Sequence, residues 1–203
     1  YDETIRQSMD DGTPIPDYLN SRGILPGIKV DTGTVDLEGY PGEKTTKGIE
    51  AEPENEWADL GTRCAEYFAM GARFAKWRAV LQITDDGCPS KLSIAENAWG
   101  LARYARSVQE SGLVPIIEPE ILMDGSHDID KCHQITTNVL NEVYNELEIH
   151  KVSLKGTILK PNMILPGSTS AQKISGEEIA KLTLKCLKGA VPSELSLIHI
   201  SEP

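Results

Sequence analysis

Lys160 lies inside an apolar segment, residues 156–163, that is expected to form a strand. An ammonium group loses its hydration in such surroundings, so a lysine is rarely placed there without a functional reason. Desolvation and a nearby cation such as Lys76 both lower the pKa of a lysine, and the free amine that results can attack a ketone. Lys160 is therefore a candidate nucleophile for Schiff-base chemistry.

Three other apolar segments carry charges at alternating positions, and successive side chains of a strand point to opposite faces. The two charges of each segment therefore share one face of its strand, as Lys160 and Asn162 do on theirs. The segments are residues 27–31 with Lys29 and Asp31, residues 74–80 with Lys76 and Arg78, and residues 115–122 with Glu118 and Glu120. If all four faces converge, one site contains both cations and carboxylates.

The charged strands have a second interpretation, in which they lie at sheet edges and expose their charges to water. A single Lys-x-Arg or Glu-x-Glu pair would favour this interpretation. Four charged strands at regular spacing favour a shared site instead, because buried charges are tolerated only where opposite charges meet and pair.

Schiff-base chemistry suggests roles for the remaining charges. The carbinolamine formed on Lys160 loses water with the help of an acid, for which either Glu118 or Glu120 is suitably placed. The iminium that follows is an electron sink, and it allows an adjacent carbon–carbon bond to break. Lys29 and Arg78 would bind phosphate or sugar hydroxyl groups.

Four expected strands alternate with four expected helices. The strands are predicted at residues 24–31, 74–83, 114–122 and 155–163, and their charged positions recur roughly every 40–47 residues. The helices are predicted from a cap at Asn55 to Gly71, from Ser90 to Gly112, after Asp128, and from a capping box at Ser175 and Glu178 to Gly189. Such alternation is typical of an α/β fold with parallel βα units.

The charges on these strands favour a closed barrel over an open, doubly wound sheet. An open sheet of that kind buries both strand faces, where charge would be costly, whereas a barrel interior can hold paired charges and a ligand. A complete barrel needs eight units and roughly 250 residues. The prediction is therefore a partial TIM (β/α)8 barrel with about four βα units, unless the fold is a smaller one.

Two segments fall outside the alternation of strands and helices. Residues 31–48 are rich in glycine, threonine and acidic side chains, and they are expected to form a loop, either at the active site or elsewhere on the surface. Residues 193–203 are compatible with a fifth strand, but they resemble a translated cloning-adaptor sequence more closely. The domain is therefore expected to span residues 1–192, with a non-native tail after it.

Composition argues against several classes of function. The chain has 203 residues and a formal net charge of −11, which makes it a poor candidate for binding nucleic-acid phosphates. No run of residues is apolar and long enough to span a membrane. The four cysteines and four histidines lack the spacing of a zinc site or a disulfide framework, so reduced thiols and no metal are expected.

The charged strands together resemble those of class I fructose-bisphosphate aldolases. The motifs that carry the resemblance are Gly-Ile-Lys-Val-Asp at 27–31, Ala-Lys-Trp-Arg at 75–78, Ile-Ile-Glu-Pro-Glu-Ile-Leu at 116–122 and Leu-Lys-Pro-Asn-Met at 159–163. They occur in the order of that family and at nearly its spacing, and the resemblance covers roughly residues 1–192.

The resemblance implies a (β/α) barrel enzyme that cleaves fructose 1,6-bisphosphate reversibly to dihydroxyacetone phosphate and glyceraldehyde 3-phosphate in glycolysis, with no metal or organic cofactor. By position, Lys160 resembles the Schiff-base lysine of the family and Glu118 its general acid/base. Glu120 and Lys76 resemble the residues that tune the lysine. The implied substrate-binding residues are Lys29, Arg78 and Asp31.

The resemblance also implies a cytoplasmic location, with a plastid location left open, and a homotetramer for the full-length protein. Residues 50–57 depart from the family pattern as an insertion, while the family's first and last barrel strands would lie before Tyr1 and after Pro192. The chain alone is therefore expected to be inactive. Two alternatives stay open: another Schiff-base lyase on the same barrel, and a non-catalytic scaffold that binds a partner.

Overall fold

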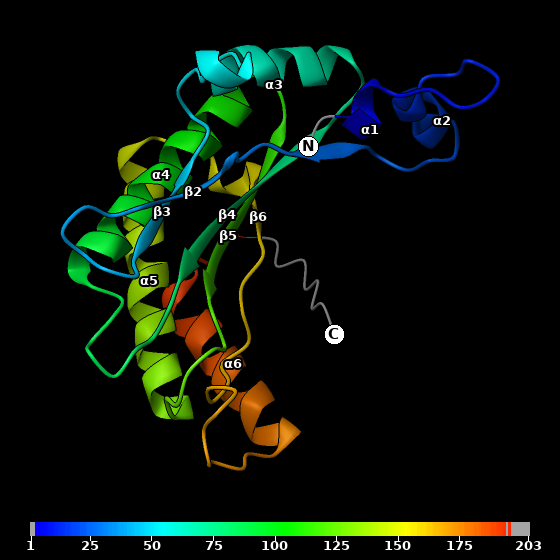
Figure 1. The fold of residues 1–203 in the computed structure, drawn as a ribbon. Coiled ribbons are helices and arrows are strands. Elements are labelled where there is room, and N and C mark those ends of the chain that lie inside the picture. Colours follow the sequence, from blue (N-terminus) through cyan, green and yellow to red (C-terminus); the bar gives the residue numbers. More distant parts are fainter. Residues whose placement is uncertain (1–2, 194, 196–203) are drawn as a thin grey trace.

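A parallel sheet lies at the centre of the computed structural model, which describes residues 3–193 and 195 (Figure 1). Its strands, in spatial order, are β1 (Gly27–Lys29), β4 (Phe74–Leu81), β5 (Val114–Ile121) and β6 (Ile158–Leu159). Every neighbouring pair is parallel. Because β4 and β5 are inner strands of this sheet, the interpretation of their charges as edge-strand charges is wrong.

A helix separates each strand of this sheet from the next, and a fourth helix follows the last strand. The helices are α3 (Leu60–Ala69), α4 (Lys91–Glu110), α5 (Ile129–Ile149) and α6 (Gly176–Ala190). α4 and α5 pack against one face of the sheet, α3 packs beside α4, and α6 packs beside α5 (Figure 1). The four βα units form a partial α/β barrel, as predicted.

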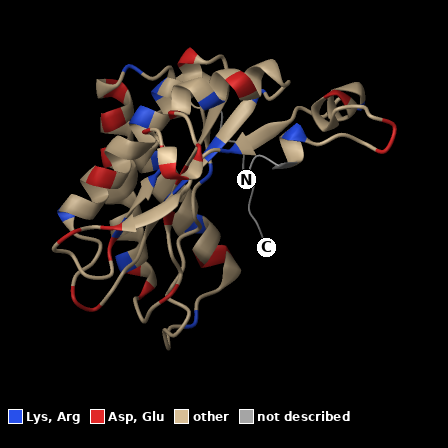
Figure 2. Cartoon of the chain, turned by 45° about the horizontal axis from the view of Figure 1, so that its top comes forward, with Lys and Arg blue, Asp and Glu red and all other residues tan. Residues whose placement is uncertain are grey.

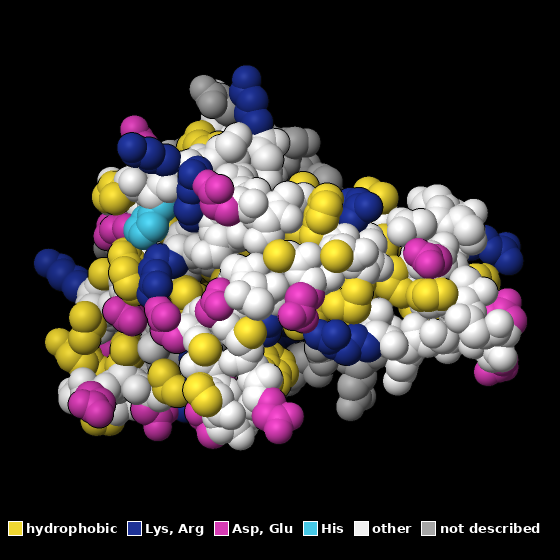
Figure 3. Space-filling model, turned by 90° about the horizontal axis from the view of Figure 1, so that it is seen from above, with side chains coloured by type: hydrophobic (Ala, Val, Ile, Leu, Met, Phe, Trp, Pro, Cys, Tyr) yellow, Lys and Arg dark blue, Asp and Glu magenta, His cyan; other side chains and the backbone are white. Residues whose placement is uncertain are grey.

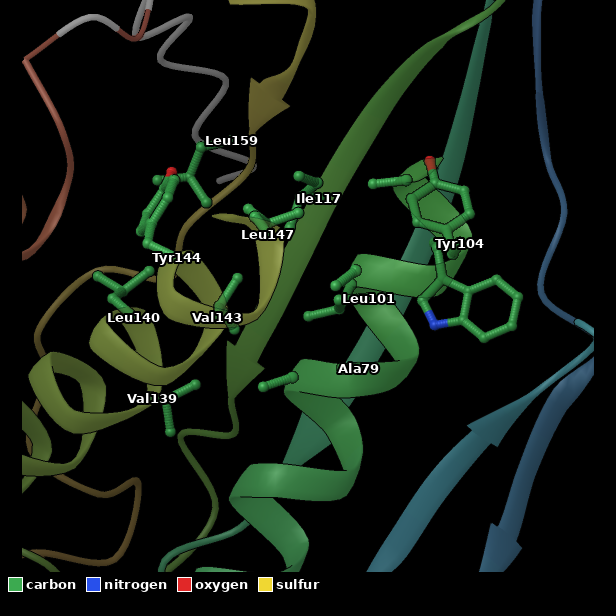
Figure 4. Close-up of a cluster of buried hydrophobic side chains, with 14 of the residues drawn as sticks. Ala79, Leu101, Tyr104, Ile117, Val139, Leu140, Val143, Tyr144, Leu147 and Leu159 are labelled. Atoms are coloured by element: carbon green, nitrogen blue, oxygen red, sulfur yellow. The ribbon is translucent and has the colours of Figure 1, made fainter. Parts of the chain in front are cut away.

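The core lies between the sheet and the helices that cover it. Every second residue of β4 is buried, beginning with Ala75 and including Trp77, and these side chains face α4. Figure 4 shows the same cluster continuing through Leu101 of α4, Ile117 of β5 and Leu147 of α5. Full burial of each large apolar side chain contributes about 1.5–3 kcal/mol. This packing leaves the opposite face of the sheet available for charged residues.

Three helices begin where they were predicted, directly after Ser90, Asp128 and Ser175, and all three residues cap their helices. Each cap oxygen accepts a hydrogen bond from the backbone N–H three residues later, at 3.0, 2.7 and 3.2 Å respectively. These bonds satisfy donors that the first turn of a helix leaves without an intrahelical acceptor. Local sequence therefore determined where these helices start.

The cap of α3 is Asp59, and the prediction of Asn55 was wrong. Asn55 instead ends a short 3-10 helix, η1 (Pro53–Asn55), and Glu56 follows it in the left-handed region with a φ of 59°. The chain therefore turns once more before the helix begins. Asp59 Oδ1 then accepts the Thr62 N–H at 3.0 Å, and Oδ2 accepts the Thr62 hydroxyl at 2.8 Å.

Residues 31–48, predicted as a loop, contain an antiparallel hairpin formed by β2 (Gly33–Asp36) and β3 (Lys44–Lys47). Its strands are short and consist mostly of polar residues, so they lack the apolar alternation on which the prediction of strands relied. Thr46 donates its hydroxyl hydrogen to the Arg78 carbonyl at 2.7 Å. The hairpin is thereby attached to β4 beside the charged face of the sheet.

The first and last strands are shorter than the predicted ones. β1 follows Pro26, and β6 lies between a 3-10 turn, η2 (Leu154–Gly156), and Pro161. Proline lacks the N–H group that a strand donates to its neighbour, so it limits the ladder at both places. The backbone N–H of Lys160 still donates to the Ile117 carbonyl at 2.9 Å, which holds Lys160 beside β5.

Two short helices, α1 (Glu3–Arg6) and α2 (Ile15–Ser21), project from one side of this body (Figure 1). Seen from above, acidic, basic and hydrophobic side chains are interspersed over the surface (Figure 3). In the described ranges, 3–193 and 195, no helix has the length and apolar character needed to cross a bilayer. The predicted tail, residues 193–203, falls outside the described residues apart from Ser193 and Leu195.

The Asp59 cap can be tested by paired substitutions. Asp59→Ala is expected to lower the free energy of unfolding by about 1 kcal/mol, because the Thr62 N–H loses its acceptor. Asn55→Ala should change it by less than about 0.5 kcal/mol, since Asn55 is exposed and caps no helix. Urea denaturation at pH 7 measures both values, and equal losses would contradict the assignment of the cap.

The stability that the Asp59 cap contributes is expected to depend on pH. The hydrogen bond from the Thr62 backbone holds the pKa of Asp59 below its ordinary value of 3.8. A carboxylate with a lowered pKa stabilises the fold above its unfolded-state pKa, and that stability is lost as the pH falls through the folded-state pKa. The difference between the parent and Asp59→Ala should therefore shrink below about pH 4 in the same urea titrations.

Candidate active site

The strand registers bring charged side chains together on the face of the sheet that α4 and α5 leave uncovered. Lys29 lies opposite Lys76, and Arg78 lies opposite Glu118. Extending the Ile117–Leu159 pair by one residue places Lys160 beside Glu118. Figure 2 shows both signs of charge on these central strands. The convergence expected from alternation therefore depends on four strands standing in matching registers.

A cavity of about 540 Å³ lies over this face. Six of the seven predicted site residues line it, and Asn162 does so as well. The six are Lys29, Lys76, Arg78, Glu118, Glu120 and Lys160. The structure thus brings residues from four strands, more than 130 positions apart at the extremes, to one site.

Glu118 lies at the centre of the charges. Its Oε1 accepts a hydrogen bond from Lys160 Nζ at 2.7 Å, and its Oε2 forms an ion pair with Lys76 Nζ. The Glu118 side chain is only 5% exposed, against 24% for Lys76 and 25% for Lys160. One buried carboxylate therefore holds two ammonium groups side by side, and both can be reached from the cavity.

This arrangement allows direct proton transfer. A general acid or base must lie within about 2.6–3.2 Å of the atom with which it exchanges a proton. The 2.7 Å separation of Glu118 Oε1 and Lys160 Nζ meets that condition. In this structure, Glu118 is therefore close enough to exchange a proton with the Lys160 nitrogen. Sequence reasoning alone left this role open between Glu118 and Glu120.

Glu120 and Arg78 form a second pair on the same face, in which Arg78 Nε donates to Glu120 Oε2. This hydrogen bond is the main reason that the pKa of Arg78 is raised above its ordinary value, and burial opposes it. The guanidinium is therefore always charged. Because it also lines the cavity, it offers a fixed cation to an anionic ligand.

Asp31 lies below the surface of the cavity and does not belong to its lining residues. It is 3% exposed, forms an ion pair with Lys29 Nζ, and accepts the Arg78 backbone N–H at 3.3 Å. The structure therefore places Asp31 so that it holds Lys29 against β4. Its predicted role as a substrate contact stays a prediction.

Asn162 continues the sheet where β6 ends. Pro161 interrupts the backbone ladder, but Asn162 Oδ1 accepts the Ile121 N–H at 3.2 Å in place of a strand carbonyl. Its Nδ2 lies 3.3 Å from Thr136 Oγ1 on α5. The side chain of Asn162 thus ties the segment that carries Lys160 to β5 and to the helix behind it.

Sequence reasoning missed the residues at the far rim of the cavity, beyond the carboxyl ends of β5 and β6. They are Met123, His127, Cys132, Met163 and Leu165. Burial lowers the pKa of His127, so its imidazole is neutral at pH 7. A histidine in the loop after a parallel strand is the available signal, because ligand-binding residues of barrels collect there.

Two loops form this rim and approach each other closely. The Gly167 N–H donates to the His127 carbonyl at 2.8 Å, and the Thr169 hydroxyl donates to the Gly125 carbonyl at 2.8 Å. A Cβ atom on Gly167 would lie 2.2 Å from the Gly125 oxygen, so only glycine fits there. The loops after β5 and β6 therefore form one connected wall.

Known proteins of similar sequence share one activity name. Residues 1–201 match the family model for class-I fructose-bisphosphate aldolase. The chain is 54% identical over 198 residues to cytosolic fructose-bisphosphate aldolase 6 of Arabidopsis thaliana, covering 98% of this chain and 52% of that protein. It is 52% identical over 198 residues to the cytoplasmic fructose-bisphosphate aldolase isozyme 2 of Pisum sativum, covering 98% of this chain and 52% of that protein. The chain belongs to the class I fructose-bisphosphate aldolase family.

A solved aldolase has the same arrangement of strands and helices. The fructose-bisphosphate aldolase of Plasmodium falciparum is 43% identical and superposes with a TM-score of 0.88, covering 95% of this chain and 54% of that one. The chain spans about half the length of the curated aldolases it matches. In the described part of this chain, no group of three or more His, Cys, Asp or Glu side chains could hold a metal ion.

The role of Glu118 as the central carboxylate can be tested through stability. Glu118→Gln is expected to lower the free energy of unfolding by about 3 kcal/mol, because two partly buried lysines lose their counter-ion. Glu120→Gln should cost less than about 1 kcal/mol, since its ion pair with Arg78 is more exposed, at 29% for Glu120 and 40% for Arg78, and the substitution removes the counter-ion of one cation only. Urea denaturation of both variants at pH 7 measures the difference, and losses of equal size would contradict a central role for Glu118.

Proposed function

We propose that the protein containing this chain cleaves fructose 1,6-bisphosphate reversibly to dihydroxyacetone phosphate and glyceraldehyde 3-phosphate, with Lys160 as the Schiff-base nucleophile. The observation that carries the proposal is the position of Lys160 Nζ, 2.7 Å from a buried carboxylate that also pairs with Lys76. The family membership and the cations around the cavity support it.

The first half of the reaction joins the substrate to Lys160. The free amine attacks the ketone carbon, a C–N bond forms, and the carbonyl electrons move to the oxygen to give a carbinolamine. Glu118 carries the extra proton of the nitrogen to the oxygen, which completes the carbinolamine. A second proton, taken up from solvent and delivered by Glu118, then protonates the departing hydroxyl group. Water leaves, and the lysine is joined to the substrate through a protonated iminium.

The second half breaks the carbon–carbon bond. A base removes the proton of the hydroxyl on the carbon that becomes the aldehyde, and the electrons of the broken bond move into the iminium to form an enamine. Glu118 is the proposed base. The aldehyde product leaves, a proton is added to the enamine carbon, and water releases dihydroxyacetone phosphate by hydrolysing the iminium.

The other charged residues prepare the lysine and hold the substrate. Lys76, beside Lys160 on the same carboxylate, favours the uncharged amine through like-charge repulsion. Glu120 takes part in this tuning through its pairing with Arg78. Lys29 and Arg78 supply cations for the phosphate and hydroxyl groups of the sugar, and Asp31 keeps Lys29 in place.

The proposal extends to the setting of the full-length protein. We place it in the cytoplasm as a homotetramer, because the relatives in Arabidopsis thaliana and Pisum sativum are named as cytosolic or cytoplasmic isozymes and the resemblance implies four subunits. Its partner is a phosphorylated sugar. The chain alone, at about half the length of these aldolases, is expected to lack turnover.

Reductive trapping tests the nucleophile. Incubation with dihydroxyacetone phosphate and borohydride should attach a stable adduct to Lys160, because borohydride reduces the iminium to an amine. Peptide mass spectrometry locates the adduct in the full-length protein and in this chain. Lys160→Met should abolish it and lower cleavage at least a thousandfold, since it removes the proposed nucleophile.

Lys181→Met is the matched control, because this lysine is exposed on α6 and does not line the cavity. It should leave both the adduct and the cleavage rate unchanged. An adduct on another lysine would overturn the role of Lys160. Trapping with a different ketone phosphate, but not with dihydroxyacetone phosphate, would favour another Schiff-base lyase. Partner binding that survives in Lys160→Met, in a parent with no cleavage activity, would favour the scaffold.

A further inference from the structure

Tyr104 is a fully buried residue of α4 that does not line the cavity. Its hydroxyl donates to the Ala75 carbonyl at 2.6 Å and lies 3.1 Å from the Ile116 carbonyl. These two carbonyls belong to neighbouring strands, β4 and β5. One helix side chain therefore connects the two inner strands of the sheet from the face opposite the active site.

The connection lies at the level of the central ion pairs. Ala75 directly precedes Lys76, and Lys76 stands in register with Ile116. Ile116 in turn lies two residues before Glu118, on the same face of β5. The Lys76–Glu118 ion pair thus crosses the gap between β4 and β5 at the place where the Tyr104 hydroxyl connects them from behind.

The position of the hydroxyl is well determined. The Tyr104 ring stacks on the fully buried Trp77 ring with centroids 5.3 Å apart and an interplanar angle of 26°. The hydroxyl has one hydrogen, which lies between the two carbonyl oxygens and is shared by them, and each oxygen keeps a second lone pair for a sheet hydrogen bond. Burial raises the pKa of Tyr104 well above its ordinary value, which keeps the hydroxyl protonated as a donor.

We propose that Tyr104 is a positioning residue for the aldol cleavage: its hydroxyl sets the separation of β4 and β5 and thereby places Lys76 and Lys160 on the two oxygens of Glu118. This proposal rests on the proposed function. Tyr104 does not line the cavity, and it acts only through the strands. Because proton transfer and amine attack are sensitive to distance, a small change in strand separation alters the reactivity of Lys160.

Tyr104→Phe removes the hydroxyl and keeps the ring that stacks on Trp77. Tyr144→Phe is the matched control, because Tyr144 is buried on α5 in the same cluster, as Figure 4 shows. Within the described residues, the Tyr144 hydroxyl has no hydrogen bond to a strand. Both variants remove the hydroxyl of a buried tyrosine and keep its ring, so an effect of general stability should appear in both.

Two measurements on this chain, repeated in the full-length protein, test the proposal. Heteronuclear NMR titration of the Lys76 and Lys160 ammonium groups reports their placement on Glu118 without requiring catalysis. Borohydride trapping with dihydroxyacetone phosphate reports the reactivity of Lys160 as a function of pH. Tyr104→Phe should shift both titrations and slow trapping about tenfold, because misplacing a reacting group by 1 Å can cost about a hundredfold. Tyr144→Phe should leave all of these unchanged.

The outcomes separate this inference from the proposed function. Unchanged titrations in Tyr104→Phe, or equal changes in both variants, would overturn the positioning role even if trapping at Lys160 succeeds in the parent. An absent adduct in the full-length parent would overturn the proposed function, and with it the catalytic purpose of Tyr104. The NMR titrations would then still decide whether the hydroxyl sets the placement of the lysines.

Discussion

The shared carboxylate of Glu118 is the interaction on which the rest of the site depends. Two lysines bind its two oxygens, and the pairing is tolerable inside the protein because opposite charges meet at hydrogen-bonding distance. The three groups come from β4, β5 and the end of β6, so their meeting requires those strands to keep one register. A slip of one residue would turn the charges of a strand toward the helices.

The remainder of the fold preserves this register from the opposite face. Apolar side chains alternate with the charged ones along β4 and pack against α4 and α5, so a slip would also expose the core. Tyr104 connects the inner strands, while Asn162 extends the sheet beyond Pro161. The charged face and the apolar face of the sheet thus stabilise the same arrangement, which is why a reactive lysine can be held there.

Regular elements with a strong local signal were predictable. The inner strands have clear alternation, and three helices start at Ser90, Asp128 and Ser175, whose side chains bind the first turn directly. Elements that depend on contacts between residues far apart in the sequence could not be predicted. The β2–β3 hairpin is polar and is held by Thr46 against β4, and the start of α3 was moved by an extra turn at η1. Neither feature has a periodic apolar pattern.

The sequence by itself determined which residues could do chemistry and which face of each strand they occupy, since alternation is a local property of the chain. It also carried the motifs of the aldolase family. Only the tertiary structure decided that Glu118, rather than Glu120, holds both lysines, and that Asp31 supports Lys29 from beneath the cavity. The physical reason is that side-chain partners across strands follow from the register between strands. That register results from packing of the whole sheet against its helices, and no single segment encodes it.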